Sequence, residues 1–252
     1  IGEGHEELIG KADNIYYVKD NDHLVIVTDK NHFKIPVKDI PSNEVPVNSY
    51  GVTLHRGSGD RILGSLVQKE DIDDNMIWYF INNLGSVKTV KESTLYSRAK
   101  STKSTVIEED ESIVDVLRCK EENTQDNFIL LVTRKGFIKL VLSSIFQPKN
   151  RESRYNKAIN LEDGDEVIFT QFLGNNLESV EAVIEVENSK GEINQEIIKI
   201  DREFIKPILN KGIRVIERGS QIQNFILNLD DSLQNEDCIR EYTEEGFTNI
   251  FK

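Results

Sequence analysis

A strand–turn–strand pattern recurs five times along the chain at a nearly constant spacing. The copies are VTDKNHFKIPV (27–37), INNLGSVKTV (81–90), VTRKGFIKLV (132–141), EVENSKGEINQEI (185–197) and REYTEEGFTNIF (240–251). The turn positions are 54, 51, 55 and 55 residues apart and are occupied by Asn31, Gly85, Gly136, Gly191 and Gly246. Glycine and asparagine adopt the positive φ of a tight hairpin turn at the lowest cost, so the pattern predicts five β-hairpins.

A second motif, a polar turn followed by a strand, alternates with the hairpins. Its copies are EGHEELIG (3–10), GSGDRILG (57–64), EEDESIVDV (108–116), LEDGDEVIF (161–169) and ERGSQIQNF (217–225). Its apolar anchors are 54, 51, 54 and 55 residues apart and are Leu8, Ile62, Ile113, Val167 and Ile222. Two independent anchors with one period indicate a tandem repeat.

A period near 50 residues with about four strands is typical of a propeller-like array. The chain starts with a second motif and ends with a first motif, so each terminus holds half of a fifth unit. Joining these halves would remove open sheet edges. We therefore predict one all-β, five-bladed domain over 1–252, whose fifth blade is completed by the N- and C-terminal halves, with repeat units at about 11–64, 65–115, 116–169, 170–224, and 225–252 plus 1–10. An open spiral with unpaired terminal halves is the alternative.

Composition excludes several other classes of protein. Apolar residues make up 38% of 252 residues, and no uninterrupted apolar run approaches the roughly 20 residues of a membrane-spanning helix. The N-terminal IGEGHEELIG lacks the basic and apolar regions of a signal peptide. Cys119 and Cys238 are far apart in sequence, so we expect reduced thiols in a cytoplasmic protein.

Charge is segregated along this acidic chain, whose formal net charge is −13. Residues 85–105 carry a local charge of +4, from Lys88, Lys91, Arg98, Lys100 and Lys103 against Glu92. Residues 134–157 carry +6, from Arg134, Lys135, Lys139, Lys149, Arg151, Arg154 and Lys157 against Glu152. Residues 223–252 carry −5. Both basic segments occupy the same phase of consecutive repeats, so their side chains are predicted to share one rim.

Such a basic arc would suit the phosphate backbone of DNA, because each cation that contacts a phosphate releases condensed counterions. Nothing in the sequence resembles a recognition helix or a base-reading ribbon, so binding would be independent of sequence. The arc could also be a solvated face with no ligand, as charge runs in loops often are.

The segments VTRKGFIKLVLSSIF (132–146) and AINLEDGDEVIF (158–169) together resemble a blade of a known domain. This is the C-terminal β-pinwheel domain of the A subunit of bacterial or phage type IIA topoisomerases, DNA gyrase A and topoisomerase IV. The resemblance implies a disc of strand-swapped blades whose basic rim bends or wraps the duplex leaving the cleavage core. It also implies three partners: double-stranded DNA, the cleavage core of the same A-type subunit, and an ATPase B-type subunit.

One feature of the gyrase A subunits is missing. Their basic, glycine-rich box Q-R-R-G-G-K-G has no match in the corresponding loops, residues 41–51, 91–105, 147–159 and 204–213. The sequence therefore favours a topoisomerase IV-like or divergent subunit over full wrapping of the gyrase kind.

Catalytic and metal-binding patterns are weak. His5, His23, His32 and His55 lack ligand spacing, although His23 and His32 flank one hairpin. Arg154–Tyr155 is not assigned the arginine–tyrosine chemistry of the family, because that pair belongs to the cleavage core. Trp78 is predicted to be in the core, and acidic pairs such as Asp163 and Asp165 are predicted to be structural. We expect no catalytic residue, metal or cofactor.

The sequence thus predicts a non-enzymatic domain that binds and bends duplex DNA for an ATP-dependent topoisomerase. The contrasting hypothesis is a propeller that docks another protein through its acidic surface. A third hypothesis, an enzyme with its active site in a central channel, lacks convergent polar residues to support it.

Overall fold

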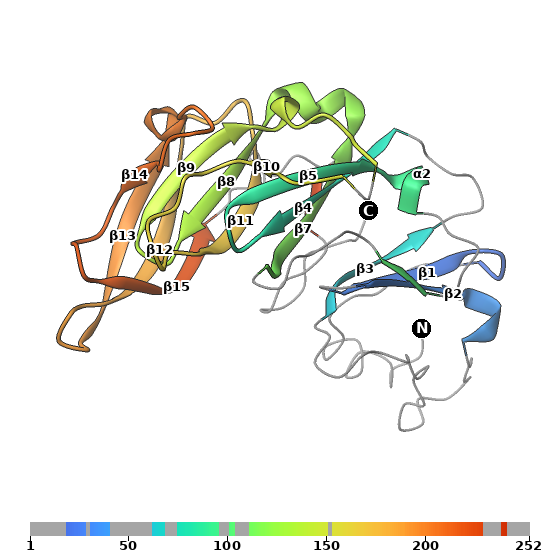
Figure 1. The fold of residues 1–252 in the computed structure, drawn as a ribbon, viewed down its shortest axis with the longest axis horizontal. Helices are drawn as coiled ribbons and strands as arrows, with labels where there is room; N and C mark the ends of the chain where they lie inside the picture. The colour runs from blue at the N-terminus through green and yellow to red at the C-terminus, as the bar shows by residue number, and fades with distance from the viewer. Residues whose placement is uncertain are drawn as a thin grey trace, which may run out of the picture. The chain divides into compact units, whose positions relative to one another are not determined.

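The computed structural model describes residues 19–28, 31–40, 62–68, 75–95, 101–103, 111–150, 153–228 and 238–240. Within this part the chain forms four antiparallel sheets, one short helix and several 3-10 turns (Figure 1). It divides into two compact units: unit 1 is Ile1–Asp73, Tyr96–Thr105 and Glu241–Lys252, and unit 2 is Asp74–Leu95 and Val106–Arg240. The all-β prediction is confirmed.

Unit 1 contains sheet A, whose order is β3 (Ile62–Gln68), β1 (His23–Thr28), β2 (Asn31–Pro36) and β6 (Ser101–Lys103), with the turn η1 (Val37–Asp39). Unit 2 contains the other three. Sheet B runs β10 (Asn156–Lys157), β5 (Ser86–Lys91), β4 (Met76–Asn82), β7 (Ile113–Lys120) and β16 (Cys238–Arg240). Sheet C runs β11 (Val167–Gly174), β8 (Asn127–Thr133), β9 (Phe137–Leu142) and β14 (Ile213–Arg214). Sheet D runs β13 (Ile193–Asp201), β12 (Ser179–Glu187) and β15 (Gln221–Asn228). The remaining elements are α2 (Glu92–Leu95), η2 (Glu121–Asp126), η3 (Ser143–Ile145) and η4 (Arg202–Phe204).

The repeat read from the sequence corresponds to the strands. Four predicted hairpins are present as β1–β2, β4–β5, β8–β9 and β12–β13. The turn glycines Gly85, Gly136 and Gly191 have φ of 72°, 79° and 81°. Glycine adopts this positive φ more readily than other residues, as the sequence pattern predicts. The second motif supplies the third strand of each sheet, β3, β7, β11 and β15. The anchors Leu8 and Gly246, and with them most of the predicted fifth blade, lie outside the described residues.

A fourth strand reaches sheets A, B and C from the following repeat. After the β4–β5, β8–β9 and β12–β13 hairpins the chain crosses to the preceding sheet, adds a short strand there, and returns to complete its own sheet. Thus β6 pairs with β2, β10 with β5, and β14 with β9. This exchange satisfies the backbone groups on the outer edge of each second hairpin strand, which would otherwise be an exposed pairing site.

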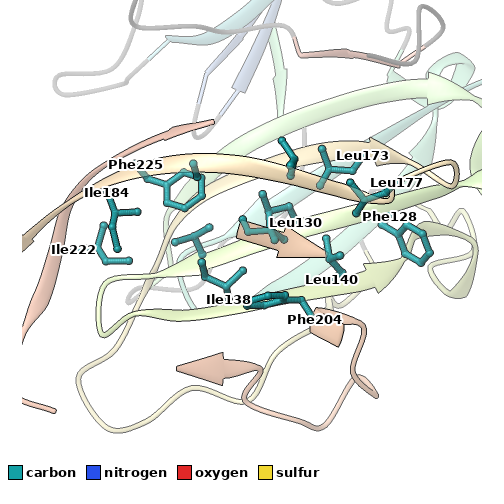
Figure 2. Close-up of a cluster of buried hydrophobic side chains, with 14 of the residues drawn as sticks. Phe128, Leu130, Ile138, Leu140, Leu173, Leu177, Ile184, Phe204, Ile222 and Phe225 are labelled. Atoms are coloured by element: carbon teal, nitrogen blue, oxygen red, sulfur yellow. The ribbon is translucent and has the colours of Figure 1, made fainter. Parts of the chain in front are cut away.

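Two apolar cores hold unit 2 together. Sheets C and D face one another through a core to which sheet C contributes Leu130 and Ile138 and sheet D contributes Ile184, Ile222 and Phe225 (Figure 2). The opposite face of sheet C packs on sheet B through a second core that includes Tyr79, Leu117 and Phe172. Sheet C is therefore covered on both faces, which explains why β8 is buried at every position and is apolar from Phe128 to Val132.

Strand β16 adds an unpredicted contact. It pairs with the outer edge of β7 and places Cys238 opposite Cys119 in the register. The sequence had assigned 225–252 to the fifth unit, whereas residues 238–240 extend sheet B. The Cys119 thiol is free and buried, as expected.

The described part of the chain contains no helix that is long and apolar enough to cross a membrane. Its one α-helix, α2, has four residues.

The turn glycines allow a matched test of the strand exchange. A Cβ at Gly136 would lie 2.2 Å from Cγ1 of Ile216, whereas a Cβ at Gly191 would lie 3.9 Å from its nearest neighbour, Oε1 of Glu187. Gly136→Ala is therefore expected to lower the free energy of unfolding by about 2–4 kcal/mol, through strain and displacement of Ile216. Gly191→Ala should lower the free energy of unfolding by only about 1 kcal/mol, because it introduces backbone strain but displaces no neighbouring side chain. Urea unfolding measures both, and equal losses would contradict the assigned contact.

Candidate nucleic-acid interface

Lys139 is not a surface cation. It lies on β9 with a fully buried side chain, and its ammonium donates hydrogen bonds to four backbone carbonyls: Ala158 (2.7 Å), Pro207 (2.6 Å), Ile208 (2.9 Å) and Asn210 (3.0 Å). Burial lowers the pKa of Lys139 to about 8, so the group is still protonated at neutral pH. The prediction that Lys139 contacts DNA is wrong, because this cation holds two chain crossings in place.

Lys88 occupies the equivalent position on β5 and is also fully buried. Its ammonium lies 5.7 Å from the ring centroid of Tyr155, whose side chain is half-buried. Lys88 must therefore be removed from the predicted DNA-contacting set as well. Tyr155 packs against the protein, while its neighbour Arg154 is exposed.

Arg134 and Lys135, in the β8–β9 turn, are held by acidic neighbours. Nε of Arg134 donates to Oε1 of Glu166 at 2.7 Å, and its backbone carbonyl accepts from the N–H of Ile222 at 2.8 Å. The backbone N–H of Lys135 donates to Oδ1 of Asp165 at 2.9 Å, and its ammonium to the carbonyl of Asp163. Both side chains are partly exposed, but their contacts tie the hairpin turn to the turn that leads into β11.

The first basic segment is only partly described. Lys91 pairs with Glu121 at 2.9 Å, and both side chains are largely solvated, so this ion pair contributes little to stability. Lys103 is placed on the backbone as the last residue of β6, opposite Asn31. Arg98 and Lys100, and Arg151 of the second segment, lie outside the described residues.

Three predicted cations remain exposed on one loop, residues 147–157, which runs from η3 to β10. They are Lys149, Arg154 and Lys157. In the described part of the chain none of them pairs with a carboxylate, and the Lys149 ammonium donates a hydrogen bond of 2.8 Å to Oδ1 of Asn156. Within the described residues of this loop, 147–150 and 153–157, these three cations therefore present positive charge that no carboxylate neutralises.

The backbone of this loop is fixed to sheet B at both ends. The Thr89 hydroxyl donates to the carbonyl of Gln147 at 2.7 Å, and the carbonyl of Thr89 accepts from the N–H of Lys149 at 2.8 Å. At the other end, the carbonyl of Gly85 accepts from the N–H of Ala158 at 2.9 Å. The cations thus project from a seated backbone, which reduces the entropy lost when they bind a ligand.

Sequence reasoning missed the basic residues at the same phase of the next repeat. Loop 205–214 carries Lys206, Lys211 and Arg214 and no acidic residue. Arg214 donates to Oε2 of Glu162 at 2.7 Å and lies over the ring of Phe137, and Lys211 pairs with the same carboxylate at 3.3 Å. Desolvation alone would raise the pKa of Glu162, but the contacts with Lys211 and Arg214 outweigh it and lower that pKa. Extending the repeat phase by one period would have found these residues.

The other residues singled out in the sequence have structural surroundings. Trp78 is buried, as predicted, and its indole N–H donates to Oε2 of Glu92 at 2.8 Å. The register places His23 opposite Pro36 and His32 opposite Val27, at the two ends of one hairpin. Within the described residues, no group of three His, Cys, Asp or Glu side chains could hold a metal ion.

Comparison with known proteins agrees with the geometry. The family model "DNA gyrase C-terminal domain, beta-propeller" matches residues 78–120 and 127–171, which cover β4 to β7 and β8 to β11. No curated protein sequence matches the chain.

Three solved structures are similar. The C-terminal domain of DNA topoisomerase IV has a TM-score of 0.66 at 15% identity, covering 90% of this chain and 72% of that one. The E. coli ParC C-terminal domain has a TM-score of 0.62 at 16% identity, and the match covers 86% of this chain and 90% of that one. The DNA gyrase A C-terminal domain has a TM-score of 0.56 at 12% identity, and the match covers 85% of this chain and 68% of that one. At these identities the structures show a shared fold, and the resemblance read from the sequence motifs is confirmed.

The Lys139 contacts generate a stability prediction. Lys139→Met keeps most of the apolar stem but removes the ammonium that donates to four backbone carbonyls, so the free energy of unfolding should fall by about 2–4 kcal/mol. Urea unfolding at pH 7 measures this loss. Lys199→Met, at an exposed position on β13, is the matched control and should change stability by less than about 0.5 kcal/mol. A similar effect at both positions would contradict a structural role for the buried ammonium.

The pKa of Lys139 adds a pH dependence. The value is about 8 in the folded protein and 10.5 in an unfolded chain, so between these pH values the unfolded state binds more protons. By linkage, this group makes the free energy of unfolding rise with pH over that interval. Comparing wild type with Lys139→Met from pH 8 to 10.5 isolates its contribution, and the stability difference should widen as pH rises. A constant difference would show that Lys139 has an ordinary pKa.

Proposed function

We propose that this chain, in which two repeats match the DNA gyrase C-terminal domain family, binds and bends duplex DNA without sequence preference as part of a type IIA topoisomerase A subunit. The observation that carries the proposal is loop 147–157, where Lys149, Arg154 and Lys157 project into solvent from a backbone fixed to sheet B. Exposed cations on a backbone held to sheet B suit a phosphate backbone, because each phosphate contact releases condensed counterions.

The repeat supplies further cations at the same phase. The exchanged strands β6, β10 and β14 each end in a basic residue, respectively Lys103, Lys157 and Arg214. Lys206 and Lys211 lie on the next loop, and Lys211 keeps an exposed side chain despite its contact with Glu162. In the proposed complex, DNA follows successive loops, so that one domain contacts a longer arc than one loop could.

Contacts distributed along an arc would favour bent DNA. Bending a 20–30 bp site smoothly costs on the order of 1–6 kcal/mol, and additional phosphate contacts offset this cost. Because no described element resembles a base-reading helix, specificity would come from the deformability of the DNA. The acidic segments would keep the duplex away from other faces of the domain.

The wider role follows from the same family match. We infer that the domain has no catalytic chemistry of its own and works in the cytoplasm with two partners, the cleavage core of its A-type subunit and an ATPase B-type subunit. The core would cut the DNA and the ATPase would drive strand passage. The domain described here would guide the duplex toward the cleavage core.

The test is a DNA titration with a charge-reversed variant. Lys149, Arg154 and Lys157 are changed together to Glu in the full chain, and binding of a fluorescent 40-bp duplex of arbitrary sequence is measured across salt concentrations. Because each phosphate contact contributes about 0.9 to the slope of log K against log salt, loss of three contacts should reduce that slope by about 2.7 and weaken binding at least about tenfold.

The matched control is Lys190, Lys199 and Arg218 changed together to Glu. These three residues are also exposed, and the net charge changes by the same amount, so a merely electrostatic effect of total charge would appear in both variants. The control should bind DNA within about threefold of wild type. Equal weakening in the two variants, or no binding by wild type at low salt, would overturn the proposal and favour protein docking on the acidic surface.

A further inference from the structure

Sheet D differs from the other three sheets at one edge. In sheets A, B and C the outer edge of the second hairpin strand is covered by β6, β10 or β14. In sheet D the equivalent strand is β13, and within the described residues it pairs only with β12. Ile193 and Ile197 on this strand are 61% and 73% exposed. β13 is thus an edge strand of nine residues with exposed isoleucines, and such an edge is a pairing site for another extended chain.

The exchanged strands show what such an edge accepts. The N–H of Ala158 donates to the carbonyl of Gly85, and that of Val215 donates to the carbonyl of Gly136, both at 2.9 Å. One residue further on, an isoleucine covers the turn glycine so closely that a glycine Cβ would lie 2.3 Å from Ile159 and 2.2 Å from Ile216. One residue before that N–H is a cation, Lys157 in one case and Arg214 in the other. The incoming segment thus has the form x–Lys/Arg–small or branched–Ile, as in NKAI (156–159) and IRVI (213–216).

The receptor for this segment is present at sheet D. Gly191 has the same positive φ as Gly85 and Gly136. Among the described residues, a Cβ built on it would meet only Oε1 of Glu187 within 4 Å, so no described isoleucine covers it. Ile193, two residues after the turn glycine, corresponds to Ile138, which β14 covers and which is fully buried. Gly191 and Ile193 therefore form the same apolar contact surface in sheet D, here called the seat, and it faces solvent.

Charge at the seat selects a basic residue. In sheet C, Arg214 lies opposite Phe137 and pairs with Glu162. The residue after Gly191 is Glu192, and the residue that precedes Ile222 by five, as Glu162 precedes Val167, is Glu217. Both glutamates are exposed, and a Cβ on Gly219 would lie 3.9 Å from Cβ of Ser189, which places the two turns side by side. Residues 179–201 carry six acidic and two basic residues, a net charge of −4.

We propose that the outer edge of β13 binds an extended segment of a partner polypeptide with the pattern x–Lys/Arg–small or branched–Ile, which adds a strand to sheet D as β14 does to sheet C. The backbone N–H that follows the cation would donate to the carbonyl of Gly191, the cation would lie between Glu192 and Glu217, and the isoleucine would cover Gly191. Among the described residues, the two segments of this form, NKAI and IRVI, are engaged in sheets B and C. The acidic edge calls for a basic occupant, and we assign the site to a segment of a partner polypeptide. This site is independent of the proposed DNA interface.

The probe is a fluorescent peptide with the sequence of residues 210–216, NKGIRVI, titrated with the full chain and followed by anisotropy. Three altered peptides test the three contacts: N-methylation at the position of Val215, Arg214→Glu, and Ile216→Ala. Each is expected to weaken binding about tenfold, because main-chain pairing, charge and the apolar seat contribute together to strand addition.

Protein variants locate the site. Glu192→Lys combined with Glu217→Lys should also weaken binding of the unaltered peptide about tenfold, whereas the Arg214→Glu peptide should bind this variant better than it binds wild type. The control is Glu178→Lys combined with Glu203→Lys, two exposed residues outside the seat, which should bind the peptide as wild type does. Circular dichroism and DNA affinity should be unchanged in both variants, which shows that each is folded.

Three results would overturn the proposal. The first is no saturable binding up to about 1 mM peptide. The second is that wild type binds the N-methylated peptide as tightly as the unaltered one. The third is that the Glu192/Glu217 variant binds the unaltered peptide as tightly as wild type does. A concentration-dependent dimer that is lost in Ile197→Lys would also overturn it, because the occupant would then be a second copy of the chain. Loss of DNA binding alone would leave the peptide result intact and so separates this proposal from the first.

Discussion

Three of the four described hairpins in this protein depend on the next repeat to satisfy their outer edge. A second hairpin strand has unpaired N–H and C=O groups on one side, and in sheets A, B and C a strand of two or three residues from the following crossing loop pairs with them. The same crossing brings Ile159 or Ile216 over a turn glycine, where no Cβ would fit. One crossing segment therefore both pairs with the strand edge and covers the turn of the preceding repeat. Glycine is required at that turn for two reasons, the positive φ and the lack of space for a Cβ.

The buried lysines follow from this constraint. A crossing chain brings backbone carbonyls that its own strand cannot satisfy, and in sheet C the ammonium of Lys139 donates to four of them. A cation is suited to this position because it has three N–H donors and no acceptor. Sheet D has Asn194 at the equivalent position, three residues after its turn glycine, and there no crossing strand is described. The residue at this position thus differs between a covered edge and an open one.

Charge counting along the sequence located a loop with exposed cations but also included buried lysines. The count of +6 over residues 134–157 treated Lys139 and Lys149 alike, because both are basic and lie close together in sequence. The alternation of a strand gives a partial signal, since Lys139 follows apolar Phe137 and Ile138 in a strand buried on both faces. The missing information was which carbonyls the next repeat brings near, and that depends on contacts 68 to 71 residues away.

The sequence by itself determined the repeat, the hairpins and the all-β architecture, because turn geometry and strand periodicity are local properties that recur every 51 to 55 residues. It also determined that positive charge gathers in the crossing loops. Only the tertiary structure decided which cations are free. Lys149, Arg154 and Lys157 project from loop 147–157, whereas Arg134 and Arg214 are paired with glutamates distant in sequence. Burial and ion pairing are set by strand exchange between repeats, which brings together residues tens of positions apart in the sequence.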